Sequence, residues 1–144
     1  MNMYSNSYLQ NQIATASPEQ LLIMFYDGAI RFTMQAAAAI EKGDIEGRSY
    51  AVNRAVAIIS ELSATLDHKI GGNIAADLDA LYNFMIRELN RGNTKNDATP
   101  LAVVEDLLSG LRETWIEAIK IKKETENVPM ATPRPTTQPL SFSL

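Results

Sequence analysis

Histidine and cysteine, two side chains that often carry catalysis, are scarce or absent in this sequence. Its 144 residues include one histidine, His68, and no cysteine. A catalytic histidine needs a partner that orients it and a cleft that holds the substrate, and the neighbouring Asp67 and Lys69 identify neither. We therefore expect His68 to be an exposed residue at the end of a helix, and we expect no catalytic residues.

The sequence also lacks the patterns that hold a metal or a cofactor. Without cysteine there are no thiolate ligands, and the di-iron sites of helical bundles need Glu-x-x-His, whereas Thr65 stands three residues before His68. Gly71 and Gly72 lack the lysine and the further glycine of a phosphate-binding loop. We therefore expect no metal and no cofactor. The formal charge of −4 and an isoelectric point near 5.0 argue against nucleic-acid partners.

Residues 18–42 carry a different kind of pattern, one that suits binding. At 100° per residue, their leucine, phenylalanine and alanine side chains form a core face of a helix. A second apolar stripe runs beside that face and consists of Ile23, Tyr26, Ile30, Met34 and Ala37. Such a helix is either enclosed by the rest of the protein or presents apolar surface to a partner. On its narrow polar strip, Asp27 and Arg31 are one turn apart and are expected to form a surface pair.

Two single residues are expected to pack rather than to bind. Gly28 lies in the middle of this helix, where glycine costs roughly 1 kcal/mol relative to alanine, so we expect a neighbouring helix to approach it closely. Trp115 is expected to lie in the core, where its indole N–H needs a hydrogen-bond partner at the edge of the bundle.

Four helices are expected to position these side chains. Ser17 can cap the first, with Pro18 in its first turn and Gln20 completing a capping box, and Gly43 ends it. Asp44 can cap the second helix. Gly71-Gly72 predicts a break, after which Asn73 can cap a third helix with Ile74 pointing inward. Residues 90–98 are expected to be a loop, and the fourth helix is expected to begin at Thr99-Pro100. Residues 15–126 thus predict an all-α, antiparallel four-helix bundle.

The two ends of the chain differ from the bundle. Residues 1–14 place Tyr4, Tyr8, Leu9 and Ile13 where a short helical or extended segment could lie on an apolar groove. Residues 127–144 hold four of the six prolines and are expected to be a flexible tail. We see neither a secretion signal nor an apolar run of the roughly 18 residues that a membrane helix needs, so we expect a soluble, cytoplasmic protein without direct membrane insertion.

Several ordered motifs resemble the flagellar secretion chaperones of the FliS family. The first two are Thr15-Ala-Ser-Pro-Glu-Gln-Leu21 and Met24-Phe-Tyr-Asp-Gly-Ala-Ile-Arg-Phe32. Further along stand Gly71-Gly-Asn-Ile-Ala75, Leu78-Asp-Ala-Leu-Tyr82, Arg87-Glu-Leu89 and Leu107-Leu-Ser-Gly-Leu-Arg-Glu-Thr-Trp115. The resemblance covers about residues 4–122. It departs at Phe25, where the family more often has leucine, and it does not extend to the proline-rich tail.

The resemblance implies a non-enzymatic chaperone of the bacterial cytosol. Such a chaperone holds the disordered C-terminal segment of newly made flagellin, prevents premature polymerisation, and delivers it to the cytoplasmic domain of the membrane export gate of the flagellar type III system. In the family, the N-terminal segment can cover an apolar part of the bundle and move when flagellin binds. Tyr8 and Ile13 match that segment, so residues 1–14 are interpreted as a cover.

We predict the flagellin-contacting residues from helical periodicity and, for Tyr8, Ile13 and Tyr26, also from the resemblance. They are Tyr8, Ile13, Ile23, Tyr26, Ile30, Met34, Tyr50 and Ala57. The last two lie on the outer line of the second helix, where small residues either admit a partner or are present as good helix formers. The alternative function is a structural or adaptor module that self-associates through the same apolar stripe, for instance as a homodimer, and has no peptide client.

Overall fold

The computed structural model describes residues 3–127, with side chains from residue 9 onward. This part of the chain is helical, with short connections and no strand, so the predicted all-α fold is confirmed. Its helices are α1 (Met3–Thr15), α2 (Pro18–Lys42), α3 (Ile45–Ala64), α4 (His68–Lys95) and α5 (Thr99–Glu126). The predicted flexible tail, residues 127–144, lies outside the described residues except for Asn127.

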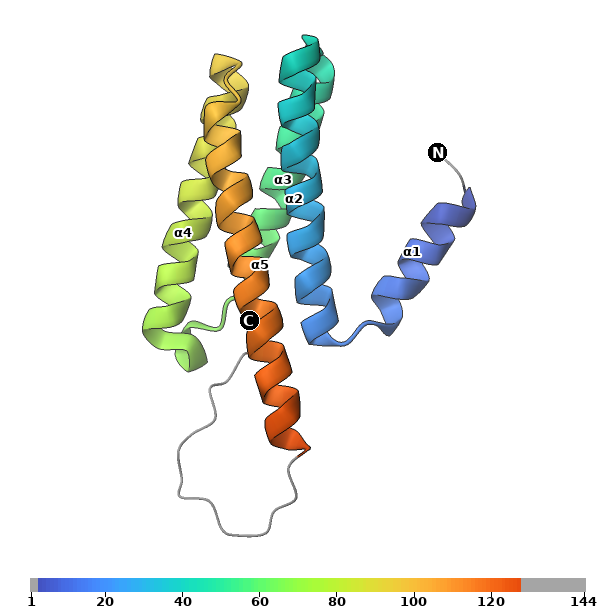
Figure 1. Cartoon of the computed structure of the whole chain (residues 1–144), viewed down its shortest axis with the longest axis vertical. Helices are drawn as coiled ribbons and strands as arrows, with labels where there is room; N and C mark the ends of the chain where they lie inside the picture. The colour runs from blue at the N-terminus through green and yellow to red at the C-terminus, as the bar shows by residue number, and fades with distance from the viewer. Residues whose placement is uncertain (1–2, 128–144) are drawn as a thin grey trace.

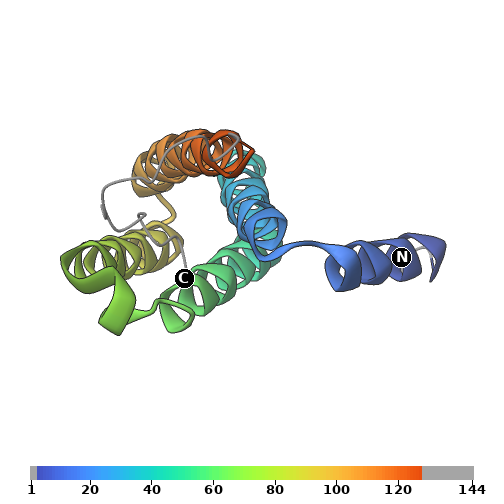
Figure 2. The same ribbon diagram turned by 90° about the horizontal axis from the view of Figure 1, so that it is seen from below.

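Helices α2 to α5 form the four-helix bundle (Figure 1). Helix α2 packs between α3 and α5, and α4 packs against the same two helices on the other side of the core (Figure 2). Glu19 of α2 pairs with Lys122 of α5, whereas Asp27 pairs with Arg112. Residue numbers on the two helices therefore run in opposite directions, as an antiparallel bundle requires.

The predicted ends of α2 are confirmed in detail. Ser17 Oγ accepts a hydrogen bond from Gln20 N at 3.1 Å, and Gln20 Oε1 accepts one from Ser17 N at 3.0 Å, which completes the capping box. Gly43 ends the helix with φ of 71°, a left-handed conformation that favours glycine. The carboxylate of Asp44 then caps α3 by accepting the N–H of Gly47 at 2.9 Å.

The start of α4 differs from the sequence prediction. The expected break is present at Gly72, where φ is 50° and ψ is −123°, but a helical turn precedes it. Asp67 rather than Asn73 caps α4, accepting the N–H groups of Lys69 and Ile70 at 3.1 Å. The extra turn packs against Ala75, which becomes buried, whereas Ile74 is 57% exposed. The prediction that Ile74 points inward is therefore wrong.

The end of α4 also differs from the prediction. Residues 90–98 were expected to be a loop, yet the helix continues to Lys95 because Gly92 is buried close to Leu101 of α5. Asn96 ends the helix in a left-handed conformation with φ of 52°. Thr99 lies inside α5 and does not cap it; instead, its N–H is held by the carboxylate of Asp97 at 2.9 Å.

The core lies between the four bundle helices and is almost wholly apolar. Thr33 is the buried polar residue among the described side chains, and its hydroxyl donates to Ala29 O at 2.8 Å. The core cluster consists of Leu22, Tyr26, Ala29, Ala36, Ala51, Val52, Ala55, Ile59, Leu62, Tyr82, Met85, Leu89, Leu101, Val104 and Leu108. No helix within residues 3–127 combines the length and the apolar character needed to cross a membrane.

Candidate binding surfaces

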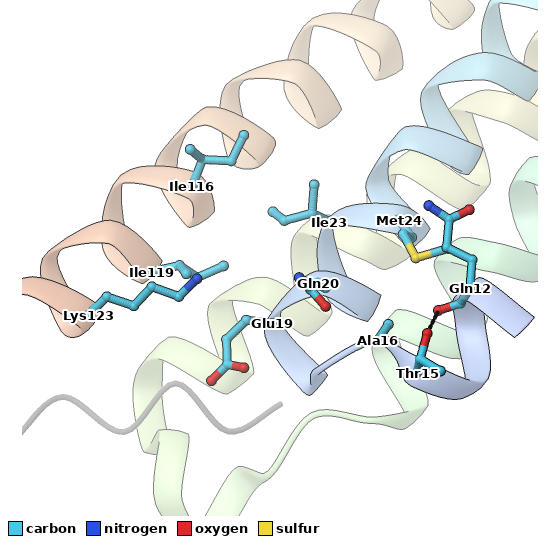
Figure 3. Close-up of a pocket in the computed structure, with 10 residues that line it drawn as sticks. All are labelled: Gln12, Thr15, Ala16, Glu19, Gln20, Ile23, Met24, Ile116, Ile119 and Lys123. Carbon is cyan, nitrogen blue, oxygen red and sulfur yellow. Dashed lines mark hydrogen bonds between the residues drawn. The ribbon is translucent and has the colours of Figure 1, made fainter. Parts of the chain in front are cut away.

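A pocket of about 430 Å³ opens where the start of α2 meets the second half of α5 (Figure 3). Ile23 of α2 faces Ile116 and Ile119 of α5 across it, and Met24 of α2 lies beside Gln12 at the end of α1. Polar side chains stand at its edge, and the end of α1 closes one side. The full lining is Gln12, Thr15, Ala16, Glu19, Gln20, Ile23, Met24, Ile116, Ile119 and Lys123. An apolar floor with a polar edge suits an amphipathic segment of a protein.

Two ion pairs hold α2 and α5 together along this seam. Lys122 Nζ lies 3.3 Å from Glu19 Oε1, and Arg112 Nε lies 2.5 Å from Asp27 Oδ1. A hydrogen bond from the backbone and a second one from Lys122 lower the pKa of the Glu19 carboxyl below its usual value. The predicted surface pair of Asp27 with Arg31 is therefore wrong: Asp27 bonds across to α5 because the Arg112 guanidinium reaches it there.

The predicted second stripe of α2 runs along the α5 side of the helix. Ile23 lines the pocket, and Ile30 packs partly buried against the core. Met34, one turn further on, is 51% exposed. This part of the stripe therefore combines a packed seam with accessible apolar surface.

Tyr26 does not lie on an accessible stripe, and that part of the prediction is wrong. Its side chain is 0% exposed. Its hydroxyl lies 2.6 Å from the Tyr82 hydroxyl of α4 and accepts the indole N–H of Trp115 at 3.1 Å. Burial raises the pKa of both tyrosines. The periodicity placed Tyr26 outward because it could not reveal that α4 and α5 supply polar partners inside the core. The predicted need of Trp115 for such a partner is confirmed.

Tyr50 and Ala57 are both exposed on α3, and Tyr50 lies on a different seam from the pocket. Tyr50 is 61% exposed and meets the ring of Phe32 edge-on, with centroids 6.2 Å apart, at the boundary between α2 and α3. Gly28 explains why this boundary is close, since a Cβ there would lie 3.2 Å from Ile58 Cδ1. The expected close packing at Gly28 is confirmed. The predicted contact residues therefore do not form one surface: Ile23 lies at the α2–α5 seam and Tyr50 at the α2–α3 seam.

Helix α1 extends away from the bundle (Figures 1 and 2). Gln12 and Thr15, near its end, line the pocket. Ile13 is 44% exposed. The side chain of Tyr8 lies outside the described residues. The use of residues 1–14 as a cover stays a prediction.

The sequence analysis missed part of the pocket. Met24 was assigned neither to the core face nor to the second apolar stripe, and Ile116, which directly follows the motif that ends at Trp115, was given no role. The spacing of Ile116, Ile119 and Lys123 by three and four residues was the available signal, because it places all three on one side of a helix. Only the pairing of α2 with α5 shows which helix faces that side.

The described residues contain no cluster of three or more histidine, cysteine or carboxylate side chains that could hold a metal ion. His68 is exposed as the first residue of α4, where the sequence predicted a helix end.

Comparisons with known proteins point to one family. The sequence model of the family described as "Flagellar protein FliS" matches residues 1–122 of the chain. Three similar proteins carry the name "Flagellar secretion chaperone FliS". The protein of Salmonella typhimurium is 39% identical over 78% of this chain and 84% of its own length. That of Campylobacter jejuni is 40% identical over 81% and 91%. That of Bacillus subtilis is 37% identical over 82% and 87%.

Proposed function

This chain belongs to the FliS family of flagellar secretion chaperones, and from that premise we propose that it binds the C-terminal segment of flagellin in the bacterial cytosol. The bound segment is kept from polymerising and is delivered to the membrane export gate of the flagellar type III system. Membership of a chaperone family implies a client protein and a binding role rather than catalysis. The resemblance of the sequence motifs supplies flagellin as the client.

The pocket at the α2–α5 seam is the observation that carries this proposal. Its floor is formed by four apolar side chains from two helices, and its edge includes glutamine, glutamate and lysine. A client segment that is disordered when free loses conformational entropy on binding, and burial of its apolar side chains offsets that cost. A helical segment with one apolar face would place that face on the floor of the pocket and its polar face towards the edge.

The predicted contact residues take different parts in this proposal. Ile23, Ile30 and Met34 contact the client along the α2–α5 seam, and Tyr50 and Ala57 contact it on the α2–α3 seam. Tyr26 supports these surfaces from inside the core and does not touch the client directly. Tyr8 and Ile13 belong to the cover that competes for the apolar surface.

Replacing Ile23 by aspartate tests the pocket. A flagellin C-terminal peptide titrated into the full chain should bind at least about tenfold more weakly to the Ile23→Asp variant, because a carboxylate would replace an apolar contact in the floor. Ile121→Asp is the matched control, since Ile121 is exposed on α5 and does not line the pocket. Both variants are first checked for native helix content and cooperative unfolding. Equal affinities for the two variants would refute the pocket as the client site.

A self-associating module remains the second candidate. Leu9 and Ile13 are exposed on α1, which extends away from its own bundle and could pack on another copy. Light scattering with and without the flagellin peptide separates the two functions. A chaperone forms a defined complex with the peptide, whereas the module keeps its mass when the peptide is added.

A further inference from the structure

Phe32 of α2 is flanked by two arginines. The guanidinium carbon of Arg31 lies 5.1 Å from the centroid of the Phe32 ring, and that of Arg54 of α3 lies 5.5 Å from it. Tyr50 of α3 meets the same ring edge-on, with an angle of 79° between the two planes. We call Arg31, Phe32, Tyr50 and Arg54 the arginine patch.

The close approach of α2 and α3 brings the arginine patch together. Gly28 lies one turn before Phe32 and packs against Ile58, which lies one turn after Arg54. The ring of Phe32 is half-buried, and its packing against the core fixes its position. Both arginines and Tyr50 remain exposed around it. The patch is therefore an accessible surface on a fixed base, and it lies at the α2–α3 boundary, whereas the pocket lies between α2 and α5.

The positive charge of the arginine patch is not balanced by the part of the chain that the structure describes. The ion pairs there use Arg91, Arg112 and Lys122, and neither Arg31 nor Arg54 takes part in one. Asp27 is the one acidic residue within a turn of Arg31 on α2, and it is bound to Arg112.

No acidic residue lies within one turn of Arg54 on α3. The positions three and four residues away on either side are uncharged: Tyr50, Ala51, Ala57 and Ile58. Two guanidinium groups beside one ring repel each other, and an anion between them would remove that repulsion. This local excess of positive charge stands out in a chain whose formal charge is −4.

We propose that the arginine patch binds an acidic side chain, aspartate or glutamate, of the client segment. The planar guanidinium group can donate two parallel hydrogen bonds to a carboxylate, and a ring beneath it keeps it less hydrated. Tyr50 provides an apolar face and a hydroxyl group for the residue next to the carboxylate. This inference rests on the proposed chaperone function and adds a charged anchor, on the α2–α3 seam, to the apolar contacts.

The test is calorimetric titration of the full chain with a flagellin C-terminal peptide. The peptide carries an amidated C-terminus, so that its carboxylates all belong to side chains. The double variant Arg31→Gln/Arg54→Gln is compared with Arg87→Gln/Arg91→Gln, which removes the same charge from exposed positions of α4. Measurements at about 50 mM and about 300 mM salt show how much of each affinity is electrostatic.

The patch variant should bind the peptide about tenfold more weakly at low salt and lose most of the salt dependence, whereas the α4 variant changes little. A second arm leaves the protein unchanged and replaces the acidic side chains of the peptide, one at a time, by their amides. One of these peptides should bind the wild type about tenfold more weakly but bind the patch variant as well as the unmodified peptide does.

Each other outcome overturns the inference. The patch is not an anchor for an acidic side chain if the patch variant binds the peptide as tightly as the wild type does. The same conclusion follows if the patch variant and the α4 variant lose affinity equally. In both cases the proposed function stands. If the wild type does not bind the peptide at all, the proposed function fails and the inference fails with it.

Discussion

Tyr26 joins three helices through one hydroxyl group. It lies on α2, and its two partners, Tyr82 and Trp115, lie on α4 and α5. The Tyr26 and Tyr82 hydroxyl groups together carry two hydrogens, but a single hydrogen bond joins their oxygens, and only one hydrogen lies in it. Tyr26 is therefore the central member of the network and Tyr82 is a terminal one.

Replacing each tyrosine by phenylalanine should give unequal losses of stability. Tyr26→Phe removes two hydrogen bonds, and we expect it to lower the free energy of unfolding by about 2 kcal/mol. Tyr82→Phe removes one bond, and we expect a loss of about 1 kcal/mol or less. Urea denaturation followed by circular dichroism measures both values. A larger loss for Tyr82→Phe than for Tyr26→Phe would contradict the central position of Tyr26.

Helix boundaries in this protein depend on two kinds of signal at the scale of the element. Local caps determine both ends of α2 and the start of α3, since Ser17, Gly43 and Asp44 act on residues within one turn of themselves. The end of α4 depends on a tertiary contact instead. Gly92 is in α4 because the missing Cβ lets the helix approach Asp97 and Leu101.

Substitution of glycines by alanine should distinguish a glycine in a tertiary contact from one in open space. A Cβ on Gly92 would lie 2.9 Å from the backbone oxygen of Asp97, so we expect Gly92→Ala to destabilise the protein by roughly 1–2 kcal/mol despite the better helix propensity of alanine. Gly110 of α5 has nothing within 4 Å of that position, and Gly110→Ala should stabilise by about 0.5–1 kcal/mol. Thermal unfolding of the two variants gives the comparison, and stabilisation by both would contradict the steric role of Gly92.

At the scale of the whole molecule, the bundle and α1 are separate in their packing. Helices α2 to α5 share one core, whereas α1 is attached through Ala16 and Ser17, and none of its described side chains, those of residues 9–15, belongs to the core cluster. The pocket lies where these two parts meet. Client binding and the position of α1 are therefore expected to influence each other.

Removing residues 1–14 tests this relation. The free energy of unfolding should change by less than about 0.5 kcal/mol, because no described side chain of α1 belongs to the core cluster. Binding of an apolar dye and affinity for the flagellin peptide should both rise, because a competitor for the apolar surface is gone. A chain without residues 128–144 controls for the shorter length. Unchanged dye binding together with unchanged affinity would count against a cover.

The sequence by itself determined the helices and the family. Caps and breaks act over a few residues, and an apolar repeat states which side of a helix avoids water, so four bundle helices and most of their core faces could be predicted from the sequence. The motifs around Ser17 and Tyr26 also carried the family resemblance, and the comparisons confirm it.

Only the tertiary structure decided which apolar side chains are accessible. Helical periodicity placed Ile23, Tyr26 and Tyr50 outside the core faces of their helices. In the structure, Ile23 lines a pocket, Tyr26 is fully buried, and Tyr50 is exposed on another seam. The same is true of Asp27, whose partner lies on α5 and not on its own helix. Periodicity describes one helix at a time, whereas burial and charge pairing depend on which helix lies beside it.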